Sequence, residues 1–208
     1  MSDILILTHA EFCPPGHLGA VLAERGLDFR VIRADLGELA GLDAERPRAV
    51  AIMGGPMSVN DDLPWLRDEL ALLRRFIERR IPLFGHCLGG QLLARALGAT
   101  VRHQPYTEMG WQPMQRESRD SPWLAGLPER FSIFQWHGDA FDLPQGAERP
   151  EMTEELVRRW IAGWPHLLDP SQPSQQSAED MLAGLPARIA GLNRVAEGFY
   201  RHWLSLID

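Results

Sequence analysis

A cysteine bracketed by glycines stands where a short apolar run passes into a segment with helical character. The apolar run ends at Phe84, and the helical segment extends from Leu88 to Leu97. A strand, a tight turn and a helix in this order form a nucleophile elbow, which lifts one side chain above a sheet. Because the N-terminus of a helix favours a thiolate, the sequence predicts a reactive cysteine here rather than a buried structural one. The motif reads Gly85-His86-Cys87-Leu88-Gly89-Gly90-Gln91.

Apolar runs and helical segments alternate through the first half of the chain. The run 4–7 is continuously apolar, as expected of a strand buried on both faces, and 29–32 and 49–53 are expected to be the next strands. Helical patterns cover 16–25 and a longer segment that begins at 62–64. This alternation favours an α/β fold, an open, mainly parallel sheet with helices on both faces. Further strands are expected at 100–104, 110–115 and 131–136.

Special residues gather at the expected carboxyl ends of strands. Gly54-Gly55-Pro56 follows one strand, Cys87 follows another, and His137-Gly138-Asp139 closes a third. Sites in parallel α/β sheets lie at this edge, so the three segments are predicted to form one site.

The helix that begins near Pro64 is predicted to have one buried and one solvated face. Its apolar residues recur every three or four positions, which makes a single stripe, and its charges cover the other faces. The stripe consists of Leu63, Leu66, Leu70, Leu73 and Ile77, and the charged residues are Arg67, Asp68, Arg74, Arg75 and Arg79.

The C-terminal part changes character. A helix is expected over 152–167, and the polar run 169–177 is typical of a linker or a mobile loop. Residues 178–208 form a helical extension whose apolar stripe packs against the domain or a second subunit, so a homodimer is one expectation. The predicted organisation is therefore a domain over 1–168, a linker over 169–177 and an extension over 178–208.

Composition excludes several classes of partner. A formal net charge of −7 argues against nucleic acid and against an anionic membrane surface. No apolar run approaches the length of a membrane span, and the two cysteines are expected to be reduced thiols, so a cytoplasmic protein is the expectation. No spacing of histidines or cysteines indicates a metal site, and no cofactor is expected.

Several motifs together resemble the class I glutamine amidotransferases. The cysteine motif is similar to their nucleophile motif, and the run that begins at Gly54 to their oxyanion strand. The residues of the run at Gly54 are typical of stand-alone members related to the amidotransferase domain of GMP synthase. The resemblance covers residues 3–165. The other matching segments are Gly54-Gly55-Pro56-Met57-Ser58-Val59-Asn60-Asp61, Glu108-Met109-Gly110-Trp111 and Trp136-His137-Gly138-Asp139-Ala140-Phe141-Asp142-Leu143-Pro144.

The resemblance implies a flavodoxin-like fold and a glutaminase half-reaction. Cys87 would attack the side-chain amide of glutamine, or of another γ-glutamyl compound, and form a thioester that water hydrolyses. A separate synthetase would accept the ammonia. The resemblance also implies that the backbone N–H groups of Gly55 and Leu88 form the oxyanion hole. The substrate-binding positions are Gly54, Gln91, Gln135 and Trp136.

The sequence departs from the family at the catalytic base. The family has a His-Pro-Glu motif, whereas this chain has Arg149-Pro150-Glu151. Glu151 would keep its catalytic position, but the histidine is absent. The five residues between Pro144 and Pro150 are also too few for the strand pair expected there. Either the chain has lost this pair or the sequence omits a stretch between about 146 and 150, and the in-frame resumption at Pro150 favours omission.

Two classes of function remain open. An enzyme would use Cys87, with His137 either structural or a substitute base. A non-catalytic glutamine-binding or regulatory protein would keep the elbow but lack the base, because an unassisted thiol is a poor nucleophile. A protease-like cysteine protein of the same broad fold is disfavoured by Gln91 and by the glycines of the oxyanion strand.

Overall fold

The computed structural model describes residues 4–44, 46–115, 122–141, 172 and 174–207. The chain divides into two compact units. The first contains the N-terminal part as far as Arg102, together with Ala140, Phe141 and residues 203–207. The second contains His103–Asp139 and the C-terminal part as far as His202.

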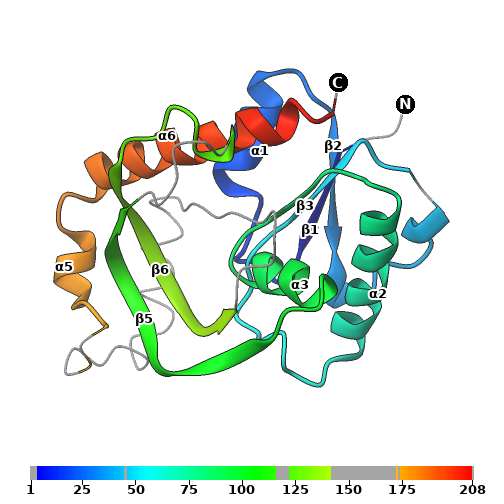
Figure 1. The fold of residues 1–208 in the computed structure, drawn as a ribbon, viewed down its shortest axis with the longest axis horizontal. Coiled ribbons are helices and arrows are strands. Elements are labelled where there is room, and N and C mark those ends of the chain that lie inside the picture. Colours follow the sequence, from blue (N-terminus) through cyan, green and yellow to red (C-terminus); the bar gives the residue numbers. More distant parts are fainter. Residues whose placement is uncertain (1–3, 45, 116–121, 142–171, 173, 208) are drawn as a thin grey trace. The chain divides into compact units, whose positions relative to one another are not determined.

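A four-stranded parallel sheet forms the centre of the first unit (Figure 1). Its order is β2-β1-β3-β4, and each neighbouring pair is parallel. The first three strands coincide with the runs expected from the sequence. Strands β1 and β3 are buried throughout and continuously apolar, whereas β2 exposes Arg30 and Val31. The strands are β1 (Ile4–Thr8), β2 (Phe29–Arg33), β3 (Ala49–Ile52) and β4 (Leu83–Gly85).

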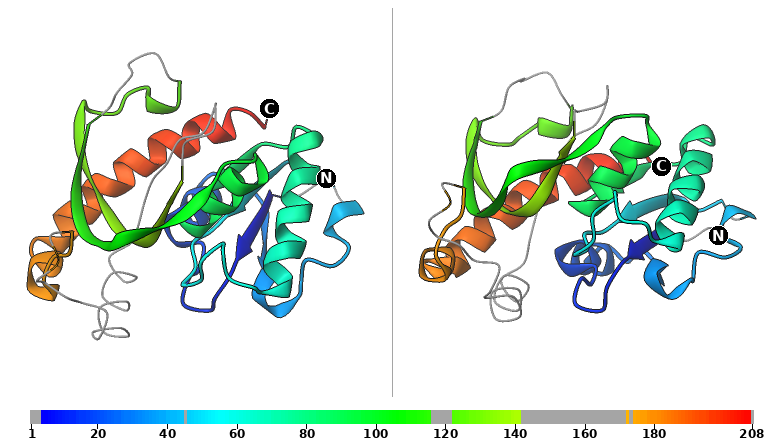
Figure 2. Two further views of the ribbon diagram at one scale, coloured as in Figure 1. Left: turned by 60° about the horizontal axis from the view of Figure 1, so that its bottom comes forward. Right: turned by 90° about the horizontal axis from the view of Figure 1, so that it is seen from below.

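Helices cover both faces of this sheet, as the two views in Figure 2 show. Alternate residues of β1, Leu5 and Leu7, lie in one core cluster with the buried residues of α2 and α3. Helix α1 buries Leu18 and Leu22 in the same unit. The expected α/β fold is thereby confirmed. The helices are α1 (Gly16–Glu24), α2 (Pro64–Glu78) and α3 (Leu88–Ala96), with short 3-10 turns η1 (Ala34–Leu36) and η2 (Leu42–Ala44).

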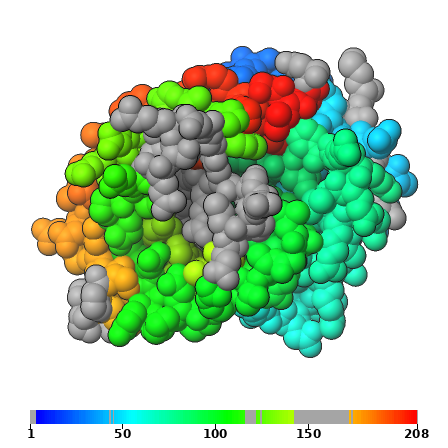
Figure 3. Space-filling model, viewed as in Figure 1, coloured from blue at the N-terminus to red at the C-terminus, as the bar shows by residue number. Residues whose placement is uncertain are grey.

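The buried face of α2 differs from the expected stripe. Leu66 and Leu73 are buried as expected, but Leu70 and Ile77 are only partly covered. The helix is rotated so that its core residues are Leu66, Glu69, Leu72, Leu73 and Phe76. The expected solvated face is present: Arg67, Asp68, Arg74 and Arg79 are exposed, and α2 reaches the surface in Figure 3.

The second unit is built on a two-stranded ribbon of β5 (Val101–Gln115) and β6 (Arg130–Phe141). Helices α5 (Ala178–Leu182) and α6 (Leu185–Leu204) supply its other apolar residues, and a 3-10 turn, η3 (Pro122–Leu124), lies between the strands in sequence. Trp111 and Phe134 of the ribbon pack in one cluster with Met181, Leu185 and Leu192. The C-terminal apolar stripe thus packs within the chain, and the expected homodimer stays a prediction.

Three expectations for this part need correction. The strands predicted at 100–104 and 110–115 are one continuous strand, β5. His137-Gly138-Asp139 lies inside β6 and not at a strand end. Part of the expected linker is paired with β5: Met109 N–H donates to the Ser174 carbonyl (3.0 Å), and Gln176 N–H donates to the Met109 carbonyl (3.0 Å).

Glu151, the shortened segment near 146–150 and the helix expected over 152–167 lie outside the described residues. They stay predictions. No helix in the described part of the chain is long and apolar enough to cross a membrane.

Candidate functional site

Cys87 lies at the turn between β4 and α3, with its side chain exposed. Its backbone φ is 47° and its ψ is −111°, a conformation that a non-glycine residue adopts only at a cost. Cys87 is the N-cap of α3, and the Gln91 N–H donates to its carbonyl over 3.0 Å. The predicted order of strand, tight turn and helix around Cys87 is present. The N-terminus of α3 places partial positive charge beside the thiol.

Two glycines allow the elbow to pack against the sheet. A Cβ at position 85 would stand 2.6 Å from the carbonyl oxygen of Gly89, and a Cβ at 89 would stand 2.6 Å from the carbonyl carbon of Ile52. Backbone atoms cannot move aside as a flexible side-chain end can. The first turn of α3 therefore lies directly on β3 only because both positions lack side chains.

The segment after β3 passes close to the elbow. A Cβ on Gly54 would stand 3.4 Å from Cys87 Cβ and 4.0 Å from its Sγ. A Cβ on Gly55 would stand 3.0 Å from both His9 Cβ and Leu88 Cδ2. The backbone of Gly54 and Gly55 is therefore held between β1 and α3. The expected oxyanion-hole positions, Gly55 and Leu88, are neighbours in the structure.

Gln91 points into the protein from the first turn of α3. Gln91 is 5% exposed, and its side-chain Oε1 has no hydrogen-bond partner within the described residues. A buried acceptor without a partner costs free energy, so such a group in a folded protein needs a reason. A polar ligand group reaching this oxygen would supply one.

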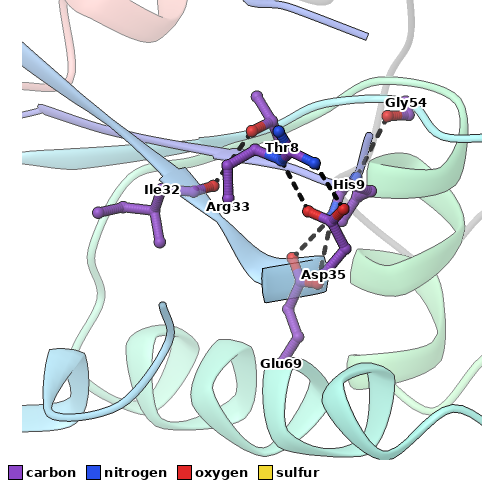
Figure 4. A network of polar contacts seen from close by, with 7 residues as sticks. All are labelled: Thr8, His9, Ile32, Arg33, Asp35, Gly54 and Glu69. Carbon is purple, nitrogen blue, oxygen red and sulfur yellow. Dashed lines mark hydrogen bonds and ion pairs between the residues drawn. The ribbon is translucent and has the colours of Figure 1, made fainter. Parts of the chain in front are cut away.

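A buried ion pair that sequence reasoning missed lies next to Gly54. His9, which directly follows β1, has its Nε2 at 3.1 and 3.2 Å from the two carboxylate oxygens of Glu69 on α2. Its Nδ1 lies 3.2 Å from the Gly54 carbonyl oxygen. Both side chains are fully buried. Figure 4 shows the imidazole between Glu69 and Gly54.

The surroundings of His9 favour its charged form. Burial lowers the pKa of His9, but the charge and hydrogen bond of Glu69 and the hydrogen bond to Gly54 more than offset this, and the resulting pKa is above its ordinary value. Asp35 also raises the pKa of His9 by its charge. Arg33 donates to Asp35 over 2.8 and 2.7 Å and holds the pKa of that carboxyl below its usual range.

The missed pair had a weak signal in the sequence. Glu69 comes three positions after Leu66 and three before Leu72, on the face of α2 that the core residues occupy. A carboxylate on an apolar face needs a partner, and a histidine at the end of a strand is one that could reach it. Which histidine reaches Glu69 depends on the parallel pairing of β1 with β3. The sequence pattern of α2 carries no information about that pairing.

The remaining expected site residues belong to the second unit. His137 Nε2 lies 2.8 Å from Gln135 Oε1 and 3.2 Å from Glu108 Oε2. Trp136 is partly buried against the apolar cluster around Trp111. Asp139 is buried and faces His103 Nδ1 at 3.1 Å, which gives it a structural partner.

The structure thus brings together Gly54, Gly55, Cys87, Leu88 and Gln91 in the first unit, and Gln135, Trp136 and His137 in the second. Glu151 lies outside the described residues. Among the residues that the structure describes, no three His, Cys, Asp or Glu side chains are grouped to hold a metal ion. The first group contains an exposed thiol, backbone N–H groups and a buried side-chain amide.

Comparison with protein families finds a match to the model described as Glutamine amidotransferase class-I over residues 17–155. One curated relative, a GMP synthase [glutamine-hydrolyzing] of Thermomicrobium roseum, is 38% identical over 104 residues. Another, from Nocardia farcinica, is 35% identical over 158 residues. These alignments cover 49% and 69% of this chain, but only 18% and 29% of the two relatives.

Solved structures show the same fold over nearly the whole chain. A glutamine amido transferase from Methylobacillus flagellatus superposes with a TM-score of 0.91 and 35% identity, covering 100% of this chain and 96% of the other. A glutamine amidotransferase from Thermotoga maritima gives a TM-score of 0.83 at 24% identity, with 97% of each chain covered.

Proposed function

Because the chain belongs to the class I glutamine amidotransferase family, we propose that it hydrolyses the side-chain amide of glutamine or of a γ-glutamyl compound through Cys87. The observation that supports this most directly is the exposed Cys87 thiol at a φ of 47° on the N-terminus of α3. A strained backbone that presents a nucleophile is a feature of working sites.

The proposed reaction has two steps. The Cys87 sulfur attacks the amide carbon of the substrate, the carbon–nitrogen bond breaks, and the nitrogen leaves as ammonia with the proton that the thiol gave up. A glutamyl thioester remains on the sulfur. Water then attacks the thioester carbon, which releases glutamate and returns the proton to the thiol.

Backbone donors would stabilise the tetrahedral intermediates of both steps. We assign this role to the N–H groups of Gly55 and Leu88, and the N–H of Leu88 is available because the first amides of a helix have no intrahelical acceptor. Preorganised donors of this kind are worth about 3 kcal/mol each in related chemistry. Gln91, with its buried Oε1, would accept a hydrogen bond from the bound substrate.

The proton transfer is the step for which the sequence departs from the family. Arg149 stands where the family has its catalytic histidine. His137 keeps both roles given above, structural or substitute base, and within the second unit its Nε2 lies 3.2 Å from Glu108 Oε2. Gln135 and Trp136 would contribute to the substrate site, and Glu151 would support the base.

The proposed reaction releases ammonia, which a synthetase could take up. The curated relatives are GMP synthases, and the chain spans less than a third of their length. A separate synthetase that takes up the ammonia is therefore the proposed partner, and hydrolysis of a small γ-glutamyl compound without a partner is the other form of the same chemistry.

The proposal is tested with the purified protein and L-glutamine. We expect equal amounts of glutamate and ammonia, a covalent glutamyl adduct on Cys87 by mass spectrometry, and loss of at least about 1,000-fold in rate in Cys87→Ser. An unchanged rate in this variant would refute the proposal. Glutamine binding by calorimetry without any glutamate release would instead support the non-catalytic binding protein.

A further inference from the structure

We propose that His9 and Glu69 are positioning residues for the oxyanion hole: the buried imidazole holds the Gly54 carbonyl, and this fixes the direction of the Gly55 N–H. The inference rests on the proposed function to the extent that the Gly55 N–H is taken as a catalytic donor. It adds two residues that touch neither the substrate nor Cys87.

The peptide between Gly54 and Gly55 connects the two groups. A trans peptide is planar, so its C=O and its N–H point in opposite directions. His9 Nδ1 lies 3.2 Å from the Gly54 oxygen, and the Gly55 N–H therefore points away from the imidazole. Both residues are glycines, which allow a peptide plane to rotate more freely than other residues do. A hydrogen bond to one end of the plane is the means of fixing the other end.

Both ring nitrogens of His9 face acceptors. Nδ1 meets a backbone carbonyl and Nε2 meets a carboxylate, 3.1 Å from Glu69 Oε1. A neutral imidazole has one N–H and can satisfy only one of them, whereas an imidazolium satisfies both. Glu69 therefore acts on Gly54 through the proton that it keeps on His9.

The packing around the pair limits alternative arrangements. The His9 ring stacks on Trp65 of α2 with centroids 5.7 Å apart, and the side chains of His9 and Glu69 are fully buried. From the other elements, Asp35 of η1 faces the ring with its charge partly used by Arg33 of β2. Because the His9 side chain is fully buried, the donor that the Gly54 oxygen meets on this side is the imidazole, which we infer sets the orientation of the peptide.

A structural role alone would also explain a buried ion pair. Such a pair stabilises the packing of α2 on β1, and its loss would lower stability without changing chemistry in the molecules that remain folded. The two roles differ in what happens to kcat. An oxyanion donor acts mainly in the transition state, so its misplacement lowers kcat while KM changes little.

The kinetic test compares two double variants, His9→Asn with Glu69→Gln and His9→Leu with Glu69→Gln. Both lack the ion pair and leave no unpaired buried charge, but only the asparagine can donate to the Gly54 carbonyl. We expect the leucine variant to lose about 10- to 100-fold in kcat for glutamine, with KM within about threefold, and the asparagine variant to recover most of this loss. Thr8→Val is the matched control, because Thr8 is buried beside His9 but donates to Ile32 (3.2 Å).

A pH profile gives a second readout. In the wild type, kcat should fall as rising pH removes the proton of His9, and Glu69→Gln should move this decline to lower pH because the carboxylate that favours the proton is gone. Alkylation of Cys87 by iodoacetamide needs no oxyanion hole and serves as the control. Its rate should be the same in all variants.

An amide resonance tests the geometry independently of activity. In protein with ¹⁵N-labelled glycine, the Gly55 amide should shift between the leucine and asparagine variants, while Gly191 of α6 should not. If the wild type releases no ammonia, the proposed function fails. The comparison of resonances still shows whether His9 sets the orientation of the Gly55 amide. Equal kcat in the two double variants of an active protein, or a Gly55 resonance indifferent to His9, would overturn the inference.

Discussion

The backbone of Gly89 touches that of Ile52: a Cβ added at position 89 would stand 2.6 Å from the Ile52 carbonyl carbon. The helix that follows Cys87 is thereby seated on the strand that leads to Gly54. One glycine thus sets the separation between the nucleophile and the segment proposed as its oxyanion hole.

Gly89→Ala should destabilise the protein by about 3 kcal/mol, because the new methyl group meets backbone that cannot move aside. Urea unfolding measures this. Gly191→Ala is the matched control in α6, where the nearest atom to the added Cβ is 3.8 Å away on the flexible Arg194 side chain. It should gain about 0.5–1 kcal/mol from helix propensity. Equal effects of the two changes would contradict the packing argument.

Gly54→Ala should leave the fold intact and reduce activity. The added methyl group would stand 3.4 Å from Cys87 Cβ, an ordinary contact distance, but it would occupy space beside the sulfur that the substrate amide must approach. We expect kcat/KM for glutamine to fall by about 10- to 100-fold with little change in the melting temperature. Full activity would show that the substrate approaches from another side.

Gln91→Met should stabilise the unliganded protein and weaken glutamine binding. The substitution removes a buried oxygen that has no hydrogen-bond partner in the described part of the chain. The free energy of unfolding should rise by about 1 kcal/mol. Calorimetry should show at least about tenfold weaker glutamine binding. Stabilisation with unchanged affinity would separate Gln91 from the substrate site.

Stability should decline as the pH rises above the ordinary pKa of histidine. The pKa of His9 in the folded protein is above its ordinary value of 6.5, so folding favours the protonated form. The resulting stabilisation is complete below that ordinary value and is lost as the pH rises through the pKa of the folded state. Urea titrations from about pH 5.5 to about pH 9 should show this loss in the wild type and a smaller one in Glu69→Gln. Parallel curves for the two proteins would contradict the assignment.

The central sheet could be predicted from the sequence because its signals are local. Strands buried on both faces are continuous apolar runs, and the glycines around Cys87 mark the elbow without reference to the rest of the chain. The alternation of these runs with helical segments was sufficient to give a parallel order. The cysteine, its glycines and Gln91 lie together at the start of α3 in the structure, and their role in a site stays a prediction.

The second unit could not be predicted to the same extent. Strand β5 continues through Pro105 and Gly110, residues that usually end a strand, because Gly110 adopts a φ of 120° and Gln176 fills the space beside it. Gln176 also bonds the backbone of Trp111, with contacts of 2.9 and 3.1 Å. The segment that completes this strand comes more than 60 positions later in the chain, and no local pattern contains that information.

The ion pair beside Gly54 was missed for a related reason. Helical spacing placed the stripe of α2 over Leu70 and Ile77, and a charged residue at position 69 had no place in an apolar stripe. The actual stripe is rotated toward Glu69 because His9 offers a partner there. A polar residue is stable in a core when it has a partner there. Its burial can therefore be predicted only when the position of that partner is also known.

The backbone conformation of Cys87 also has a consequence for the evolution of this chain. A cysteine at a φ of 47° carries a conformational cost of about 1–3 kcal/mol that glycine would not. Cysteine and glycine codons differ by one nucleotide, so a lineage released from selection for thiol chemistry has a short mutational path to a more stable protein. In a chain without its reaction, selection for stability would favour that exchange, and position 87 is where such a history would be visible.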